Sequence, residues 1–425
     1  MGGFARAEAR GSLWFRVWEV LTVGGFARAE ARGSLWFWAF SMARKRVIIL
    51  GSTGSIGRKT LEVLADLGDE FVVVGLAGGT RWQELAEQAN RWQPEYIAIG
   101  DESLEARLKA EVPAGATVLG GGDGLEELVV RSECDIVVSA IVGTAGLLAT
   151  VRAVRMGKRV AIANKETLVV AGALITRLAR ESGAELIPVD SEHSAIFQAL
   201  HSGRREELRK IYLTSSGGPF RTWTMEQIRD ATLTDAQVHP IWDMGPKITI
   251  DSATMMNKAL EIVEARWLFD VPADKIEVLI HPETVIHSMV EFHDGCLIAQ
   301  LGTPDMRIPI QYALTYPRRL PSCAEPLDIM GLRCLNFETP DVVRFPALQL
   351  GFDVAAKGGS AGAVLNAANE AAVIAFRAGQ IKFGEITDLV TDALSRHEWV
   401  DSPTMEQLLA ADAWARNEVG ACLKC

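Results

Sequence analysis

The sequence predicts an α/β fold that begins with a doubly wound parallel sheet. Short apolar runs typical of buried strands recur along the first half of the chain, and helical stretches separate most of them. A glycine-rich turn joins the first of these runs to a helical stretch, which is the arrangement of a nucleotide-binding domain. With 425 residues, and roughly 100–200 residues per domain, the chain should form two or three domains.

The predicted strands follow from apolar runs bounded by polar or glycine residues. They are residues 46–50, 71–77, 96–99, 135–139, 160–163 and 185–188. The turn after the first strand reads GSTGSIG (51–57), and apolar residues at helical spacing follow it. Glycines let the backbone approach a pyrophosphate, and the N-terminus of the helix offers free N–H groups to its charge. Outside this context a glycine turn is a weak signal, because glycine serves any tight turn.

The end of the second strand bears on the choice of cofactor. NAD enzymes usually carry Asp or Glu there to bind the ribose 2′-hydroxyl. This chain instead has Gly78, Gly79, Thr80 and Arg81. Arg81 can pair with a 2′-phosphate, which favours NADP over NAD, although it can equally be an exposed loop residue.

Composition narrows the function and the location. The net charge of -11 argues against general binding to nucleic acid, whereas a local basic or amide-lined pocket can still hold a phosphorylated small molecule. The six cysteines include one C-x-x-C, Cys422 and Cys425, without the second ligand pair of a structural zinc site. Sparse cysteines predict a reducing compartment, and no apolar run approaches the roughly 20 residues of a membrane span. We therefore expect a cytoplasmic protein.

The N-terminus contains a perfect repeat. Residues 2–15 read GGFARAEARGSLWF, and residues 24–37 repeat them without a change. The repeat fits neither a secretory signal nor a transit peptide, and structural repeats normally diverge. We expect residues 1–41 to be a non-native or disordered extension that packs poorly, so that the working protein begins near Met42.

Two acidic segments carry the expected chemistry. Asp190 and Glu192 follow an apolar run, and if they continue the strand their side chains share one face. In the second segment, which looks helical from Ala253, Asn257, Lys258 and Glu261 fall on one face. A solvated acidic loop and a plain surface ion pair are the simpler interpretations of these two patterns.

Taken together, the two segments supply three carboxylates, Asp190, Glu192 and Glu261, which suit Mg²⁺ or Mn²⁺. Lys165 follows another predicted strand, so it should lie at the same edge of the sheet. Glycines at both ends of the segment from Ser216 to Gly245 suggest a hinged loop that closes over substrate.

At this point the sequence resembles the 1-deoxy-D-xylulose 5-phosphate reductoisomerases, over nearly all of the chain after Met42. Eight motifs in the same order carry the resemblance: GSTGSIG (51–57), ANKE (163–166), PVDSEH (188–193), SSGGPF (215–220), HPIWDMGPKI (239–248), DSATMMNKALE (251–261), LIHPETVIHSMV (279–290) and LNAANEAAV (365–373). The resemblance implies an NADPH- and metal-dependent conversion of 1-deoxy-D-xylulose 5-phosphate to 2-C-methyl-D-erythritol 4-phosphate, for isoprenoid biosynthesis by the non-mevalonate pathway. It also implies a homodimer.

The resemblance assigns roles to individual residues. The metal ligands would be Asp190, Glu192 and Glu261, and the catalytic groups Lys165, Glu192 and His239. The substrate would contact Lys165, Ser191, Glu192, Ser216, His239, Trp242, Ser252, Asn257, Lys258 and Glu261, with Trp242 and Met244 in the lid. The cofactor would contact Thr53, Gly54, Ser55, Ile56, Gly79, Arg81, Asn164, Glu166 and Gly245. Lys165, Glu192 and a metal-bound water all remain candidates for proton transfer.

The resemblance also implies an N-terminal Rossmann-like dinucleotide domain, a central α/β catalytic domain and a C-terminal helical bundle. We place these at residues 42–189, 190–315 and 342–425, with a linker at 316–341. The chain departs from many relatives at Thr80 and Arg81, where they have a basic residue and Asn. Two alternative functions are another NADP-linked dehydrogenase, which would need no metal, and a non-catalytic NADPH sensor, which would show no turnover.

Overall fold

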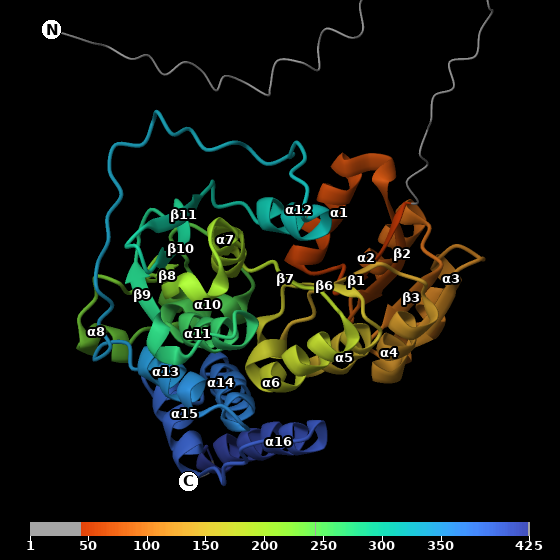
Figure 1. Cartoon of the computed structure of the whole chain (residues 1–425). Helices are drawn as coiled ribbons and strands as arrows, with labels where there is room; N and C mark the ends of the chain where they lie inside the picture. The colour runs from red at the N-terminus through yellow and green to blue at the C-terminus, as the bar shows by residue number, and fades with distance from the viewer. Residues whose placement is uncertain (1–43, 243, 424–425) are drawn as a thin grey trace, which may run out of the picture. The chain divides into compact units, whose positions relative to one another are not determined.

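A seven-stranded parallel sheet organises the first part of the chain, coloured red to yellow in Figure 1. The structure, a computed structural model, describes residues 44–242 and 244–423; the predicted extension, residues 1–41, lies outside them. The strand order is β4-β3-β2-β1-β5-β6-β7, as expected for a doubly wound fold. The strands are β1 (Lys45–Leu50), β2 (Phe71–Gly78), β3 (Tyr96–Ile99), β4 (Thr117–Gly120), β5 (Ile136–Ser139), β6 (Arg159–Ile162) and β7 (Leu186–Pro188).

The six strands predicted from sequence are confirmed, and no predicted strand end differs from the observed end by more than one residue. Strand β4 was not predicted. Its four residues, Thr117–Gly120, include only two large apolar side chains, and it lies at the edge of the sheet. An edge strand needs less apolar surface than a central one, so its sequence signal is weak.

Helices cover both faces of this sheet. Val47 and Ile49 of β1 join one buried cluster, while Ile48 and Leu50 join another, because successive side chains point to opposite faces. The first cluster includes α1 (Ser55–Leu67), α2 (Trp82–Trp92), α3 (Glu105–Glu111) and α12 (Arg307–Thr315). The second includes α4 (Gly121–Arg131), α5 (Leu147–Arg155) and α6 (Lys165–Ser182).

A second, mixed sheet follows, in the order β11-β10-β8-β9. Strands β8 and β9 are parallel, and β10 runs antiparallel to both β8 and β11. The strands are β8 (Leu208–Ser215), β9 (Ile276–Ile280), β10 (Ile286–Phe292) and β11 (Leu297–Leu301). The helices of this part are α7 (Ser191–Ala199), α8 (Met225–Arg229), α9 (Leu233–Ala236), α10 (Pro246–Ala253) and α11 (Met256–Leu268).

Four helices complete the described chain: α13 (Ala347–Lys357), α14 (Ala361–Arg377), α15 (Glu385–Arg396) and α16 (Met405–Cys422). Helix α14 is buried along most of its length and contacts α6, α15 and α16, so the helical part shares a core with the rest. Helix α12 lies beside α1 although the predicted range 190–315 groups it with the central domain (Figure 1). The domain boundaries remain predictions. Within the described ranges, no helix is both long and apolar enough to cross a membrane.

Candidate active site

Three carboxylates meet where β7 ends and α7 begins. Asp190 is the N-cap residue of α7, Glu192 lies in its first turn, and Glu261 reaches them from α11. Their oxygen atoms lie within 4.8 Å of one another. Asp190 and Glu192 do not continue the strand, the condition under which we expected them to share a face, since β7 ends at Pro188 and α7 begins at Ser191. The start of the helix, not the alternation of a strand, brings the two acids together.

Two lysines point into this carboxylate cluster. The Lys165 Nζ lies 2.5 Å from Asp190 Oδ2 and 3.0 Å from Glu261 Oε1. The Lys258 Nζ lies 2.7 Å from Glu192 Oε1 and also contacts Glu261. Burial opposes both ammonium charges, but the carboxylates outweigh it and raise the pKa of Lys165 and of Lys258 above the ordinary value.

The charge and donor set of the cluster fit a hard divalent cation. Three carboxylates face two ammonium groups, so negative charge remains in a buried place. Burial and the neighbouring Glu192 raise the pKa of Glu261, because like charges crowd there. Carboxylate oxygens are the ligands that Mg²⁺ prefers, and a cation between them would relieve the crowding.

A break between two helices aims the residues of α11. The sequence suggested one helix from Ala253; instead α10 ends at Ala253, Met255 is left-handed with φ 62°, and α11 begins at Met256. The shared face of Asn257, Lys258 and Glu261 is confirmed. Asn257 donates to Glu261 Oε1 at 2.5 Å and accepts from Lys165 Nζ at 2.9 Å.

Behind the cluster lies a buried histidine–glutamate pair that was not predicted from the sequence. His193 Nε2 lies 3.0 Å from the Glu261 carbonyl oxygen, and His193 Nδ1 lies 3.5 Å from Glu264 Oε2. Both side chains are fully buried; burial raises the pKa of Glu264 well above its ordinary value and lowers that of His193, so both favour their neutral forms. The available signal was spacing, because Glu264 follows Glu261 by three residues on one helix.

His239 braces the loop between β8 and α10. Its Nδ1 accepts from the backbone N–H groups of Ile241 at 3.2 Å and Trp242 at 2.9 Å. The proton of the neutral ring is therefore on Nε2, which donates to Ser216 Oγ at 3.1 Å. Partial burial lowers the pKa of His239 to about 4, which keeps the ring neutral. Trp242 and Ser191 line one small cavity, so the loop faces the start of α7.

The glycine turn has the close packing that a dinucleotide requires. Gly51 has φ 90°, and a Cβ there would lie 2.5 Å from the Ala140 carbonyl oxygen. A Cβ on Gly57 would lie 2.3 Å from the Gly51 carbonyl oxygen. Gly54 is the N-cap of α1, so no side chain covers the first N–H groups of the helix, at Ser55 and Ile56. These N–H groups fit a phosphate, and Thr53 is buried within the turn.

Lys247 ties together residues predicted to contact the cofactor. It follows Gly245, the N-cap of α10, by two residues, and its Nζ lies 3.1 Å from Glu166 Oε1 and 2.9 Å from Asp251 Oδ2. Asn164 caps α6 beside Glu166 and donates to the Gly143 carbonyl oxygen at 2.8 Å. Lys247 had no predicted role, because its partner Glu166 lies on a different helix, 81 positions away in the sequence.

The remaining predicted residues lie at two places. Arg81 is the N-cap of α2 and pairs with Glu84 at 3.2 Å, just beyond Gly79 and the end of β2. Ser252 lies in α10, where its carbonyl oxygen would be 2.5 Å from a Cβ on Gly218, so the SSGGPF loop packs against α10. Met244 lies between Trp242 and α10, and its carbonyl oxygen accepts from Thr249 at 3.5 Å.

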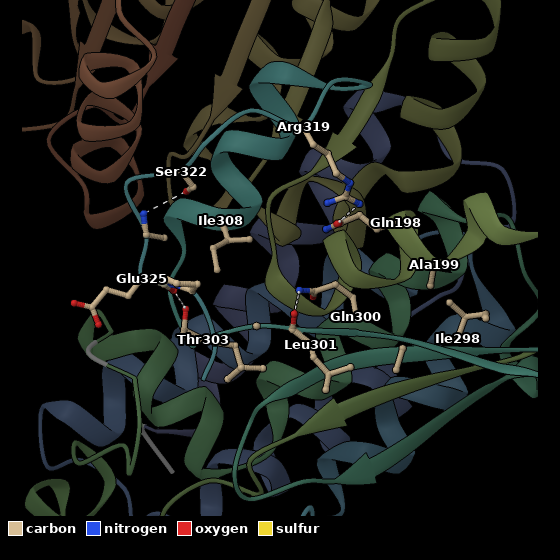
Figure 2. A pocket seen from close by; sticks show the side chains of 15 residues that line it. Gln198, Ala199, Ile298, Gln300, Leu301, Thr303, Ile308, Arg319, Ser322 and Glu325 are labelled. Atoms are coloured by element: carbon tan, nitrogen blue, oxygen red, sulfur yellow. Dashed lines mark hydrogen bonds between the residues drawn. The ribbon is translucent and has the colours of Figure 1, made fainter. Parts of the chain in front are cut away.

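The largest of the cavities described here is not at the carboxylates. It has a volume of about 670 Å³ and lies between β11, α7 and the segment from Arg319 to Leu327. Figure 2 shows Gln198 and Gln300 in its lining, with Arg319 donating to Gln198 Oε1 at 2.8 Å. Gln198 and Gln300 also line the small cavity beside Trp242. The large cavity therefore adjoins the site but holds none of its charged residues.

Sequence comparisons give one family. Profiles described as 1-deoxy-D-xylulose 5-phosphate reductoisomerase match residues 47–172, and profiles of its C-terminal regions match residues 186–269 and 301–418. The reductoisomerase of Chlorobium phaeovibrioides is 51% identical over 370 residues, which are 87% of this chain and 96% of that protein. That of Pelotomaculum thermopropionicum is 49% identical over 376 residues, 88% of this chain and 97% of that one.

Solved structures agree. The Zymomonas mobilis reductoisomerase in complex with NADPH has a TM-score of 0.84 at 43% identity, covering 89% of this chain and 99% of that one. A reductoisomerase in complex with NADPH, fosmidomycin and magnesium has a TM-score of 0.85 at 38% identity, covering 89% and 98%.

Proposed function

The chain belongs to the 1-deoxy-D-xylulose 5-phosphate reductoisomerase family, and we propose that the carboxylate cluster and the glycine turn carry the two halves of that reaction. The protein is an NADPH-dependent oxidoreductase that converts 1-deoxy-D-xylulose 5-phosphate to 2-C-methyl-D-erythritol 4-phosphate, with magnesium as its metal. The assignment of each residue below is our proposal. The observation that carries it is the convergence of Asp190, Glu192 and Glu261 with Lys165.

Asp190, Glu192 and Glu261 would hold the magnesium ion. Bound there, the metal supplies Lewis-acid polarisation of neighbouring oxygens of the substrate. Lys165 and Lys258 already neutralise part of the carboxylate charge, and both are long enough to turn from the carboxylates toward substrate oxygens. Asn257 fixes the orientation of Glu261 and Lys165 through its amide.

Ser216, Ser252, Asn257 and Lys258 would grip the substrate phosphate, away from the reacting carbons. Binding energy from such a remote group positions the substrate for the reaction. Ser191 and His239 would contact substrate oxygens, and Trp242 with Met244 would cover them and exclude water. His239 acts as a neutral donor through Nε2, because its Nδ1 is occupied by two backbone N–H groups.

The glycine turn would hold the pyrophosphate of NADPH, which supplies the hydride. Thr53, Gly54, Ser55 and Ile56 present the turn and the first N–H groups of α1. Asn164 and Glu166 lie at the start of α6 and Gly245 at the start of α10, and Lys247 joins these two helices. The cofactor would therefore lie between the glycine turn and the end of the lid.

A homodimer is proposed for the face that includes β11. This strand lies at the sheet edge, all of its residues are at least partly exposed, and Leu297 is 53% exposed. An open apolar edge is a site for pairing with a second copy. Light scattering on the full chain tests this, with Leu297→Lys expected to shift a dimer toward monomer.

The five described cysteines are all free, which supports the cytoplasmic location.

The reaction is tested with the full chain. NADPH absorbance is followed after addition of 1-deoxy-D-xylulose 5-phosphate with Mg²⁺, and again with excess EDTA. Oxidation that requires both substrate and metal supports the proposal. Oxidation that persists in EDTA would favour a dehydrogenase without a metal, and no oxidation by a folded, NADPH-binding protein would favour a sensor.

A further inference from the structure

Three charged side chains meet over the carboxyl end of β2: Arg81, predicted above to contact the cofactor, and Arg58 and Glu84, which have no role assigned so far. Arg58 lies in the first turn of α1, and its Nη1 lies 3.1 Å from Glu84 Oε1. Arg81, the N-cap of α2, places its Nη1 3.2 Å from Glu84 Oε2. Each carboxylate oxygen of Glu84 thus holds one guanidinium, and the trio carries a net positive charge.

The trio lies where the adenosine ribose of a dinucleotide belongs. Arg58 Nη1 also donates to the Thr53 carbonyl oxygen at 2.8 Å, which attaches it to the glycine turn. Arg81 begins the helix that follows β2, and in dinucleotide-binding folds this strand end meets the 2′ position of the ribose. A Cβ built on Gly79 meets no described atom within 4 Å, so the space over the strand end is open.

The two arginines suit a phosphate, and the glutamate does not. Their side chains are 49% and 52% exposed, so each guanidinium keeps N–H donors toward solvent while Glu84 holds one edge. Arginine binds phosphate through several charge-assisted hydrogen bonds. Glu84 would repel a 2′-phosphate, whereas it could accept a hydrogen bond from a 2′-hydroxyl, the usual role of an acid near this strand end.

We propose that Arg58 and Arg81 together bind the 2′-phosphate of NADPH, and that Glu84 sets how strongly the enzyme prefers NADPH over NADH. NADPH would take the two arginines from Glu84, while NADH would keep the trio intact and use the carboxylate. The inference rests on the proposed function only in its assumption that the glycine turn binds this dinucleotide. It makes Glu84 a specificity-determining residue for the cofactor.

The test measures binding and does not use turnover. The Kd of NADPH and of NADH is determined by calorimetry for the full chain without metal or substrate. Arg58→Met and Arg81→Met should each weaken NADPH binding about tenfold or more, because each removes hydrogen bonds between charged groups. The Kd of NADH should change less than about twofold. Glu84→Gln should tighten NADPH about twofold to fivefold, within the range of exposed ion pairs, and weaken NADH.

Matched controls on the same helix are Glu87→Gln and Arg91→Met, which change the net charge equally but lie farther along α2. They should leave the ratio of the two dissociation constants unchanged. Arg58→Lys keeps the charge and should retain part of the preference for NADPH. Equal weakening of both dinucleotides by Arg58→Met would show that Arg58 only braces Thr53, and would overturn the proposal. An unchanged ratio in Glu84→Gln would overturn the role of Glu84.

The proposal and the reaction fail separately. Substrate-dependent oxidation of NADPH by the unaltered chain depends on the carboxylate cluster, whatever the arginines do. If the wild-type chain turns over but the variants leave the ratio of the NADPH and NADH dissociation constants unchanged, this inference is wrong and the proposed function stays in place.

Discussion

The glycine turn and the carboxylate cluster are built in opposite ways. The turn is seven consecutive residues, and its close packing arises within it, because Gly57 lies so near the Gly51 carbonyl oxygen that no Cβ would fit. The cluster joins α6, α7 and α11, and its contacts link residues far apart, as Lys165 and Glu261 are by 96 positions. A local site can be recognised from a short run of sequence, whereas an assembled site depends on the whole fold.

The comparison predicts that each half can be damaged without the other. The largest effect is expected for Glu261→Gln, which replaces a proposed metal ligand with a neutral amide. The same change removes one of the two carboxylate partners of Lys165 and one of the two of Lys258. Turnover should fall by at least about a thousandfold, since Lewis-acid stabilisation contributes several kcal/mol. The Kd of NADPH should stay within about twofold, because the turn lies on other elements. Near-normal activity in this variant would contradict the metal assignment.

The converse change is Gly57→Ala, which damages the turn. Its Cβ would lie 2.3 Å from backbone oxygen and cannot be accommodated without movement of the turn. NADPH affinity should fall about tenfold or more, as expected when donors to a charged group are lost. Gly122→Ala is the matched control, because a Cβ there meets no described atom within 4 Å. An unaffected Kd in Gly57→Ala would remove the turn from the cofactor site.

Much of the first half was predictable from sequence, and less of the second. The six predicted strands and the glycine turn depend on local patterns, so they are confirmed almost to the residue. Continuation of the strand through Asp190 and Glu192 was considered because the apolar run before them extends to Val189; the structure instead begins a helix at Ser191, with Asp190 as its N-cap. Glu264 was missed because its partner His193 lies on another helix, and Lys247 because its partner Glu166 lies 81 positions away on α6. The roles of the site residues came from the resemblance.

A smaller effect is expected at His239, whose two ring nitrogens have different tasks. His239→Asn keeps an acceptor near the Nδ1 position and should preserve the loop, but it loses the donor to Ser216. His239→Gln keeps a group near Nε2 and loses the brace. We expect His239→Asn to raise the substrate KM about tenfold, for one lost hydrogen bond to substrate oxygen. Equal kinetic effects of both variants would contradict the separation of tasks.

His239 also predicts a pH dependence of stability. Its pKa is about 4 in the folded chain, against the ordinary value of 6.5. Between these values the unfolded chain binds more protons, so this contribution to stability is present above pH 6.5 and is lost as pH falls toward 4. Urea unfolding of wild type and His239→Asn from pH 4 to 7 should show a steeper rise in the wild type. Parallel curves would contradict a lowered pKa.

The smallest effect on turnover is expected at Lys247, which joins α6 to α10. Lys247→Met leaves Glu166 and Asp251 buried without their cation, which should cost about 3 kcal/mol of unfolding free energy. The folded fraction should lose less than about tenfold in NADPH affinity, because Lys247 positions Glu166 and does not itself bind the cofactor. Thermal unfolding and calorimetry separate these effects. A loss of NADPH binding as large as that of Gly57→Ala would place Lys247 in the cofactor site.

The central claim is that Asp190, Glu192 and Glu261 form a metal site, and equilibrium binding of Mn²⁺ tests it most directly. Mn²⁺ serves as a paramagnetic substitute for Mg²⁺. The full chain is titrated with Mn²⁺ in the absence of NADPH and substrate, and the concentration of free Mn²⁺ is measured from its electron spin resonance signal. We predict one bound ion per chain in the wild type, and affinity lower by at least about a hundredfold in Glu261→Gln. Equal Mn²⁺ binding by both proteins would contradict the assignment.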